Sequence, residues 1–246
     1  MKGFKRMFIA NFKEFIRDRS GLFWLLAFPV VFIGLFGLLF TGGGQGGEAF
    51  SDFEFVFPGI MAMALMQLGL FGAMNFLSLR ENKVIRSLSV TPLSKMALLS
   101  SEILLKILIG FAQASIILTI GIFGFGIEVT NPLYLVYFFV LIGAMVFVSL
   151  GYMLITFATS IESGSGIAQV AQISMMFLAG IFFPVDMLPD IIQPVVRVIP
   201  LTYLADGFRQ VIVGFPGDHT MAVNLSFLVG WLVITSIVTM KFWRWE

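Results

Sequence analysis

The sequence contains no cysteine and only one histidine, His219, among its 246 residues. The missing cysteine excludes disulfide frameworks, thiolate metal sites and cysteine nucleophiles. A single histidine without a second histidine or a cysteine cannot form a metal site, and no nucleophile elbow accompanies it that would complete a catalytic triad. The sequence therefore predicts no catalytic residue, no metal site and no cofactor in this chain.

Charged side chains are scarce as well. They make up 12% of the sequence, against roughly 25% in soluble domains. Hydrophobic residues make up 59%, and the mean hydropathy is +0.99. Several apolar runs are long enough to cross the hydrocarbon of a bilayer. We expect an all-α polytopic membrane protein, one domain over residues 1–246, with six helices at or across the membrane at residues 21–41, 55–79, 96–127, 132–161, 163–185 and 220–240.

The phosphate-binding motif G-x-x-x-x-G-K-[ST] is also missing, so the chain cannot itself carry a P-loop ATPase. The central positions of the apolar runs, such as Ile107 to Ile127 in the third helix, hold no Asp, Glu, Lys or Arg. Ion-coupled carriers place ionisable groups there. We therefore expect the energy for any transport to come from another subunit.

The basic residues are distributed unevenly along the predicted helices. If the N-terminus is cytoplasmic, every Lys and Arg except Arg197 and Arg209 falls on the inner side. This distribution follows the positive-inside rule. It predicts that both termini lie in the cytoplasm.

The first twenty residues, 1–20, read as an amphipathic helix. Phe4, Phe8 and Phe12 repeat at helical spacing opposite a basic face that includes Arg17. This pattern favours an interfacial helix lying flat on the inner leaflet. The alternative is a simple basic anchor before the first span, and it leaves the topology unchanged.

Amide side chains interrupt two of the apolar runs. Gln67, Phe71 and Asn75 follow i, i+4, i+8 spacing in the second helix, and Gln169 and Gln172 lie three apart in the fifth. These residues, together with Met176, are candidates for lining a substrate pathway, because methionine gives an adaptable apolar surface. The alternative is that the amides only hold helices together, at about 0.6 kcal/mol for each interhelical hydrogen bond.

The inner loop at residues 80–95 predicts a short helix over residues 81–89. Thr91 and Pro92 give the N-cap and the first position of the helix that follows. An apolar stripe with two basic neighbours could fit a groove on a soluble partner or lie among anionic headgroups. The stripe is Val84, Ile85 and Leu88, and the basic neighbours are Lys83 and Arg86.

The outer segment at residues 186–214 is too apolar for a loop and too rich in proline for a span. We expect a short re-entrant helical hairpin, since lipid-exposed irregular backbone is not tolerated. Its second helix would run from Leu201 to Val213 and end at Gly214, with Asp206 and Arg209 able to pair. The other candidate residues of this external hairpin are Pro184, Asp186, Pro189 and Pro200.

Several of these residues occur in motifs that resemble a known family. The runs Gly180-Ile-Phe-Phe-Pro-Val-Asp-Met-Leu-Pro189, Ile199-Pro-Leu-Thr-Tyr203 and Ala205-Asp-Gly-Phe-Arg209 are similar to the signature of type-2 ATP-binding-cassette (ABC) exporter permeases. The inner loop, with Arg80-Glu81, Leu88 and Thr91-Pro92, resembles the coupling segment of that family. One departure is Asn82-Lys83-Val84, where many members have a basic residue and a glycine.

The resemblance implies an assembly rather than a lone chain. It implies two copies of a separate ABC ATPase subunit, which bind ATP and Mg²⁺, and a second permease half in a homodimer or heterodimer. Substrates would be amphipathic molecules such as drugs, lipids, lipid-linked glycans or peptides, exported from the cytoplasm of a bacterium or archaeon across its cell membrane. Membrane lipid is an expected partner and nucleic acid is not.

The rival interpretation is a non-transport membrane enzyme or assembly factor that handles a lipid headgroup on the outer face. It would use the charges of the outer segment as its polar cluster. Those residues are Asp186, Asp190, Asp206 and Arg209.

Overall fold

The computed structural model describes residues 2–41, 48–83, 95–182, 185 and 189–243, and all the regular structure in these ranges is helical. The elements follow one another as α1 (Lys2–Arg17), α2 (Arg19–Thr41), α3 (Glu48–Gly72), α4 (Met74–Glu81), α6 (Lys95–Phe125), α7 (Leu133–Phe157), α8 (Ile161–Leu178), α9 (Gln193–Val196), α10 (Pro200–Phe208), the π-helix η2 (Arg209–Val213) and α11 (Met221–Phe242). The expected all-α fold class is confirmed.

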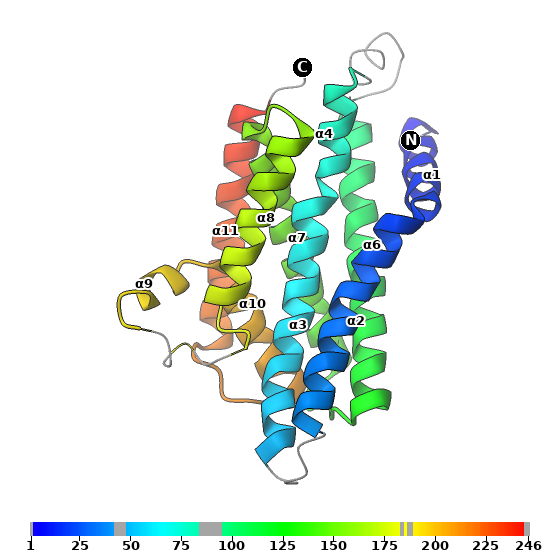
Figure 1. Cartoon of the computed structure of the whole chain (residues 1–246). Coiled ribbons are helices and arrows are strands. Elements are labelled where there is room, and N and C mark those ends of the chain that lie inside the picture. Colours follow the sequence, from blue (N-terminus) through cyan, green and yellow to red (C-terminus); the bar gives the residue numbers. More distant parts are fainter. Residues whose placement is uncertain (1, 42–47, 84–94, 183–184, 186–188, 244–246) are drawn as a thin grey trace.

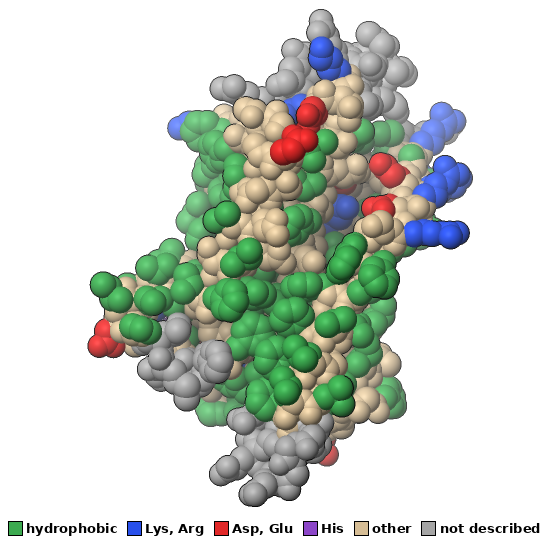
Figure 2. All heavy atoms as spheres, in the orientation of Figure 1, with side chains coloured by type: hydrophobic (Ala, Val, Ile, Leu, Met, Phe, Trp, Pro, Cys, Tyr) green, Lys and Arg blue, Asp and Glu red, His purple; other side chains and the backbone are tan. Residues whose placement is uncertain are grey.

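The long helices form a bundle in which successive helices alternate in direction (Figure 1). Helix α1 lies beside one end of this bundle, and α11 finishes at the same end. Figure 2 shows Lys and Arg side chains gathered mainly at that end, whereas hydrophobic side chains cover the body below it. Helix α1 and the last turn of α11 therefore lie at the end of the bundle where most of these basic side chains gather.

Five helices in the described part of the chain are long and apolar enough to cross a membrane: α2, α3 with α4, α6, α7 and α11. They support a multi-pass membrane protein. The remaining long helix, α8, has 18 residues, and its Gly, Ser and Gln side chains lower its hydropathy. The predicted span at residues 163–185 therefore stays a prediction.

Helix α3 forms the centre of the bundle and packs against α2, α6, α7 and α10. Its tightest neighbour is α7, where Gly69 faces the backbone of Phe147 and Gly151 faces the backbone oxygen of Gly69. A Cβ atom at either glycine would collide with main-chain atoms of the other helix. Small residues permit this close backbone approach between membrane helices.

The outer segment folds as α9, α10 and η2. The predicted second helix, Leu201 to Val213, is present as α10 followed by η2, and Gly214 ends it with a φ of 69°. Every residue of α10 is buried, and the helix packs on α3 and α11. By contrast, Ile191 beside α9 is 86% exposed. The depth of this hairpin in a membrane stays a prediction.

The inner loop is described only at its two ends. Helix α4 ends at Glu81, and Lys83 follows with a φ of 57°. The predicted helix over residues 81–89 falls largely outside the described residues. The same is true of the predicted coupling residues Val84, Ile85, Arg86, Leu88, Thr91 and Pro92.

Candidate functional site

The most polar large cavity lies toward the α1 end of the bundle and has a volume of about 740 Å³. This volume lies within the range of small-molecule sites, roughly 300 to 1,000 Å³. Helices α1, α2, α3, α4, α6 and α8 all contribute to its wall. The polar lining residues are Asn11, Glu14, Asp18, Gln67, Asn75, Ser78, Glu102, Lys106 and Gln172.

The apolar part of the wall is rich in aromatic rings. Those rings are Phe15, Trp24, Phe28 and Phe71. The cavity therefore offers both an apolar surface and a set of hydrogen-bonding groups. Such a lining suits a molecule with an apolar body and a polar end.

The structure brings together four of the six residues predicted to line a pathway. Gln67, Phe71 and Asn75 from α3 and α4 meet Gln172 from α8 in this cavity. Gln169, one turn earlier on α8, is exposed and does not line it. Met176 packs against the main core instead. The spacing of Gln67, Phe71 and Asn75 predicted correctly which face of α3 and α4 lines the cavity. The spacing of Gln169 and Gln172 did not show which of the two faces the cavity from α8.

Most of the other lining residues were not predicted from the sequence, and among them are two charged residues of α6, Glu102 and Lys106. The uncharged run begins at Ile107, whereas α6 already starts at Lys95 and the stretch that is apolar enough to span a membrane begins at Met96. At 1.5 Å per residue, Glu102 lies about 10 Å into α6. The expectation of a span free of ionisable groups thus holds only for the later part of α6. The sequence signal for these two residues was the i, i+4 spacing of Glu102 and Lys106 directly before the apolar run, which places both on one face of the helix.

Helix α1 closes one side of the cavity by packing along α6. Phe8 and Phe15 contact the apolar cluster of Leu68, Leu105 and Ile109. Asn11 Nδ2 donates a hydrogen bond to Ser101 Oγ on α6 at 3.2 Å. The predicted amphipathic helix is therefore present, and half of its apolar surface is used inside the protein.

Other apolar residues of α1, among them Phe12 and Ile16, are exposed, and so is its basic face. Phe4 is half-buried and stacks on Phe8, whereas Phe12 is 45% exposed. Arg17 ends the helix on its exposed face. This pattern is typical of a helix at a membrane surface, although its contact with lipid stays a prediction.

At the inner end, α4 is bonded to the corner between α7 and α8. Arg80 donates to the backbone oxygen of Ala158, and Glu81 Oε2 accepts from the backbone nitrogen of Ile161 at 2.8 Å. A carboxylate is favourable at the start of a helix, where the N–H groups of α8 point outward. These two bonds join the end of α4 to the start of α8, the helix that carries Gln172.

Arg209 in the outer segment is held by backbone carbonyls. Its Nε donates to the oxygen of Phe55 at 3.0 Å, and one terminal nitrogen donates to Gly180 at 2.6 Å and Ile181 at 3.1 Å. The guanidinium also lies 3.7 Å from the Phe55 ring centroid, a cation–π contact. Burial lowers the pKa of Arg209 to about 10, so the side chain stays charged at neutral pH.

Asp206 has its own separate set of donors. Asn224 Nδ2 donates to it at 2.8 Å, and the backbone nitrogens of Asp218 and His219 donate at 3.1 and 3.2 Å. The predicted pairing with Arg209 is wrong as a direct contact, because each side chain is occupied by other segments. Arg209 thus joins the outer segment to α3 and to the residues that follow α8, and Asp206 joins it to α11.

The remaining residues of the outer segment do not converge on a site. Pro200 begins α10 and is buried, while Pro189 and Asp190 are exposed, and Asp190 accepts from Gln193 at 3.2 Å. Pro184 and Asp186 lie outside the described residues. In the part of the chain that the structure describes, no three His, Asp or Glu side chains are placed to hold a metal ion. Of the four charges in the rival interpretation, Asp206 and Arg209 are thus bonded to other segments and Asp190 accepts from Gln193, while a hollow of about 320 Å³ nearby is lined by the different polar residues Arg197, Asp218 and His219.

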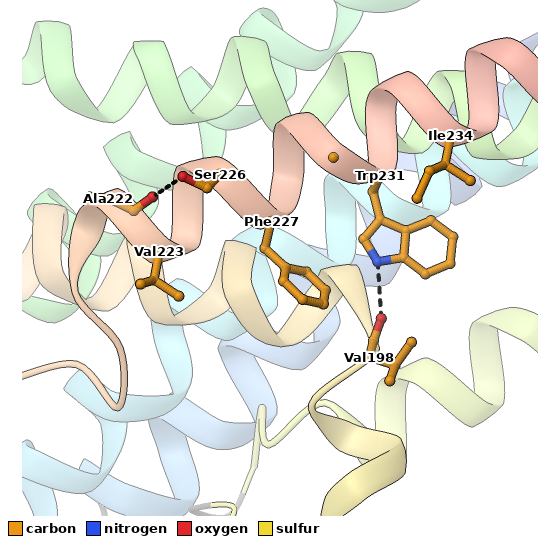
Figure 3. A pocket seen from close by; sticks show the side chains of 8 residues that line it. Val198, Ala222, Val223, Ser226, Phe227, Trp231 and Ile234 are labelled. Carbon is orange, nitrogen blue, oxygen red and sulfur yellow. Dashed lines mark hydrogen bonds between the residues drawn. The ribbon is translucent and has the colours of Figure 1, made fainter.

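A second hollow runs along α11 and has a volume of about 500 Å³ (Figure 3). Trp231 Nε1 donates to the backbone oxygen of Val198 at 3.0 Å, and the hydroxyl of Ser226 donates to the backbone oxygen of Ala222 at 2.7 Å. The polar side chains of this groove are thus satisfied within the protein. It offers only apolar contact.

These features define a multi-pass membrane protein with a large, partly polar cavity near the end where α1 lies. The family model of the ABC-2 type transporter matches residues 2–213, and the chain therefore belongs to this family as a permease subunit. Over 112 residues, 46% of this chain, it is 30% identical to a Bacillus subtilis (strain 168) protein described as uncharacterized protein YhgE. The matching stretch spans 14% of the length of that relative.

Proposed function

We propose that this chain is the membrane-spanning subunit of an ATP-driven ABC exporter, which moves an amphipathic substrate out of the cytoplasm by alternating access. Two copies of a separate ATPase subunit would bind and hydrolyse ATP with Mg²⁺. The observation that carries the proposal is the cavity of about 740 Å³, with its aromatic wall and its amide and charged groups.

The hydrogen bonds of α4 supply a route from the ATPase to this cavity. The inner loop at residues 80–95 begins with Arg80 and Glu81, which bind the α7–α8 corner. A partner that pushes on the loop would move α4 and α8 together as a rigid unit. Because Gln172 of α8 and Asn75 of α4 line the cavity, this movement would change its shape.

A second permease half, in a homodimer or heterodimer, belongs to the same proposal. Helix α8 presents exposed apolar residues at helical spacing, Val170, Ile173 and Phe177, beside the exposed Gln169. An exposed apolar surface of this kind on α8 can contact either lipid or a second permease half. The basic end of the molecule in Figure 2 supports an orientation with both termini in the cytoplasm of a bacterial or archaeal cell.

The coupling assignment is tested by reconstituting the chain with its ATPase subunit. We expect Leu88→Asp and Arg86→Glu each to abolish stimulation of ATP hydrolysis without lowering membrane insertion, because a buried charge or a reversed charge would disrupt docking. Lys241→Glu, a charge reversal at the end of α11 and outside the loop sequence, is the control, and this variant should stimulate ATP hydrolysis normally. Unchanged stimulation by both loop variants would refute the assignment.

The cavity assignment is tested by transport of several amphipathic substrates. Phe71→Ala and Gln172→Leu should change the relative rates of two substrates by about tenfold, the usual effect of reshaping a pocket contact, while assembly stays normal. Gln169→Leu, on the same helix but outside the cavity, should leave the ratio unchanged. If all three variants transport every substrate as the parent does, the cavity is not on the route.

A further inference from the structure

We propose that the cavity selects positively charged amphipathic molecules and that Glu102 is the group that binds their cation. The inference rests on the proposed function for its role in transport, but the binding itself needs only this chain. It follows from the state of the Glu102 carboxylate, the balance of charge around it and the nature of the cavity wall.

The Glu102 carboxylate is buried without a partner. Its side chain is 1% exposed, and neither carboxylate oxygen has a hydrogen-bond partner within the protein. Asn75 and Tyr152 are neighbours of Glu102, yet neither completes a hydrogen bond of normal length. An unpaired buried carboxylate is costly, and such a group takes up a proton unless a positive charge pairs with it. A ligand that brings a positive charge would remove this cost.

The charge of the cavity is negative overall. Glu14, Asp18 and Glu102 line it, and Lys106 is the one basic side chain among the described lining residues. Lys106 does not neutralise Glu102 by direct contact, since the two form no ion pair within 4.0 Å. Its ammonium lies 6.0 Å from the centroid of the Phe15 ring. An added cation is therefore favoured over an added anion.

A second acceptor in the cavity wall, the side-chain oxygen of Gln67, also lacks a hydrogen-bond donor. Gln67 Oε1 is buried in the same wall and has no hydrogen-bond partner. The rings of Phe15, Trp24 and Phe71 can contact the apolar body of a ligand and interact with a cation through their faces. An acceptor pair within an aromatic wall matches an ammonium or other lipophilic cation.

The experiment compares two probes of similar size and opposite charge, tetraphenylphosphonium and tetraphenylborate. Binding is measured on the full chain in lipid nanodiscs, with empty nanodiscs as the blank. We expect specific binding of the cation only. Glu102→Gln, which keeps the side-chain shape, should weaken cation binding by about tenfold or more, as expected for loss of a buried charge partner.

Two further variants complete the design. Glu128→Gln, on an exposed residue beyond the far end of α6, should bind the cation as the parent does. Lys106→Gln should bind it more tightly, because a repelling charge is removed, and this gain cannot arise from misfolding. Equal binding of the two probes by the parent, or unchanged cation binding by both Glu102→Gln and Lys106→Gln, would overturn the inference. Stimulation of the ATPase by the parent chain would then still stand as a separate test of the exporter proposal.

Discussion

Gly151→Val is expected to destabilise the folded protein by about 3 kcal/mol or more, at the upper end of the cost of overpacking a core. The reason is that a side chain at Gly151 collides with the backbone of α3 at Gly69 and Leu70 rather than with a flexible side chain. Two helices must then separate along the most extensive contact in the bundle. The measurement is thermal unfolding of the purified protein in detergent, where roughly 2–4 °C is lost per kcal/mol.

Gly230→Val provides the matched control on α11. A Cβ atom at Gly230 meets nothing within 4 Å, so the same substitution adds an apolar side chain to an open surface. We expect this variant to have the same melting temperature as the parent protein. Equal melting of Gly151→Val and the parent would show that α3 and α7 do not approach as closely as the structure indicates.

Arg209→Met is expected to have the second largest effect. It removes the donors to three backbone oxygens, those of Phe55, Gly180 and Ile181. Leaving a buried acceptor without a partner costs about 1–3 kcal/mol, so we expect a loss of roughly 3 kcal/mol together with early proteolysis of the outer segment. Melting temperature and limited proteolysis measure the two effects.

Arg209→Lys and Arg197→Met test the cause of that loss. Lysine keeps the charge but lacks the planar fork that reaches several acceptors at once, so it should recover only part of the stability. Arg197 is exposed, and its substitution by methionine should leave the melting temperature unchanged. Full recovery with lysine would mean that charge alone, and not the fork, holds the segment.

The sequence predicted the helices well where the pattern is local. Hydropathy located α2, α7 and α11, and helical periodicity located α1. The end of η2 at Gly214 was predicted because a glycine with positive φ ends helices often. These features depend on residues a few positions apart.

The candidate site depended on contacts between distant residues and was predicted only in part. Arg209 and Asp206 are three apart, which favoured a pair, but Arg209 bonds to Phe55, 154 positions away. Glu102 resembled a surface residue beside an apolar run, because nothing local indicates that α1 folds back along α6. Gln67, Phe71 and Asn75 were identified because one helix presents them together.

The central position of α3 also bears on how the chain enters the membrane during synthesis. Most of α3 is covered by other helices, and α6, α7 and α10, which cover much of it, come later in the chain. When α3 first leaves the insertion machinery, the Gln67 side chain and the surface at Gly69 face lipid without a later helix against them. A polar group without a hydrogen-bond partner in hydrocarbon costs free energy. The contacts that bury α3 are therefore completed only after α6, α7 and α10 have joined it, so an early helix of the chain gains most of its neighbours from later ones.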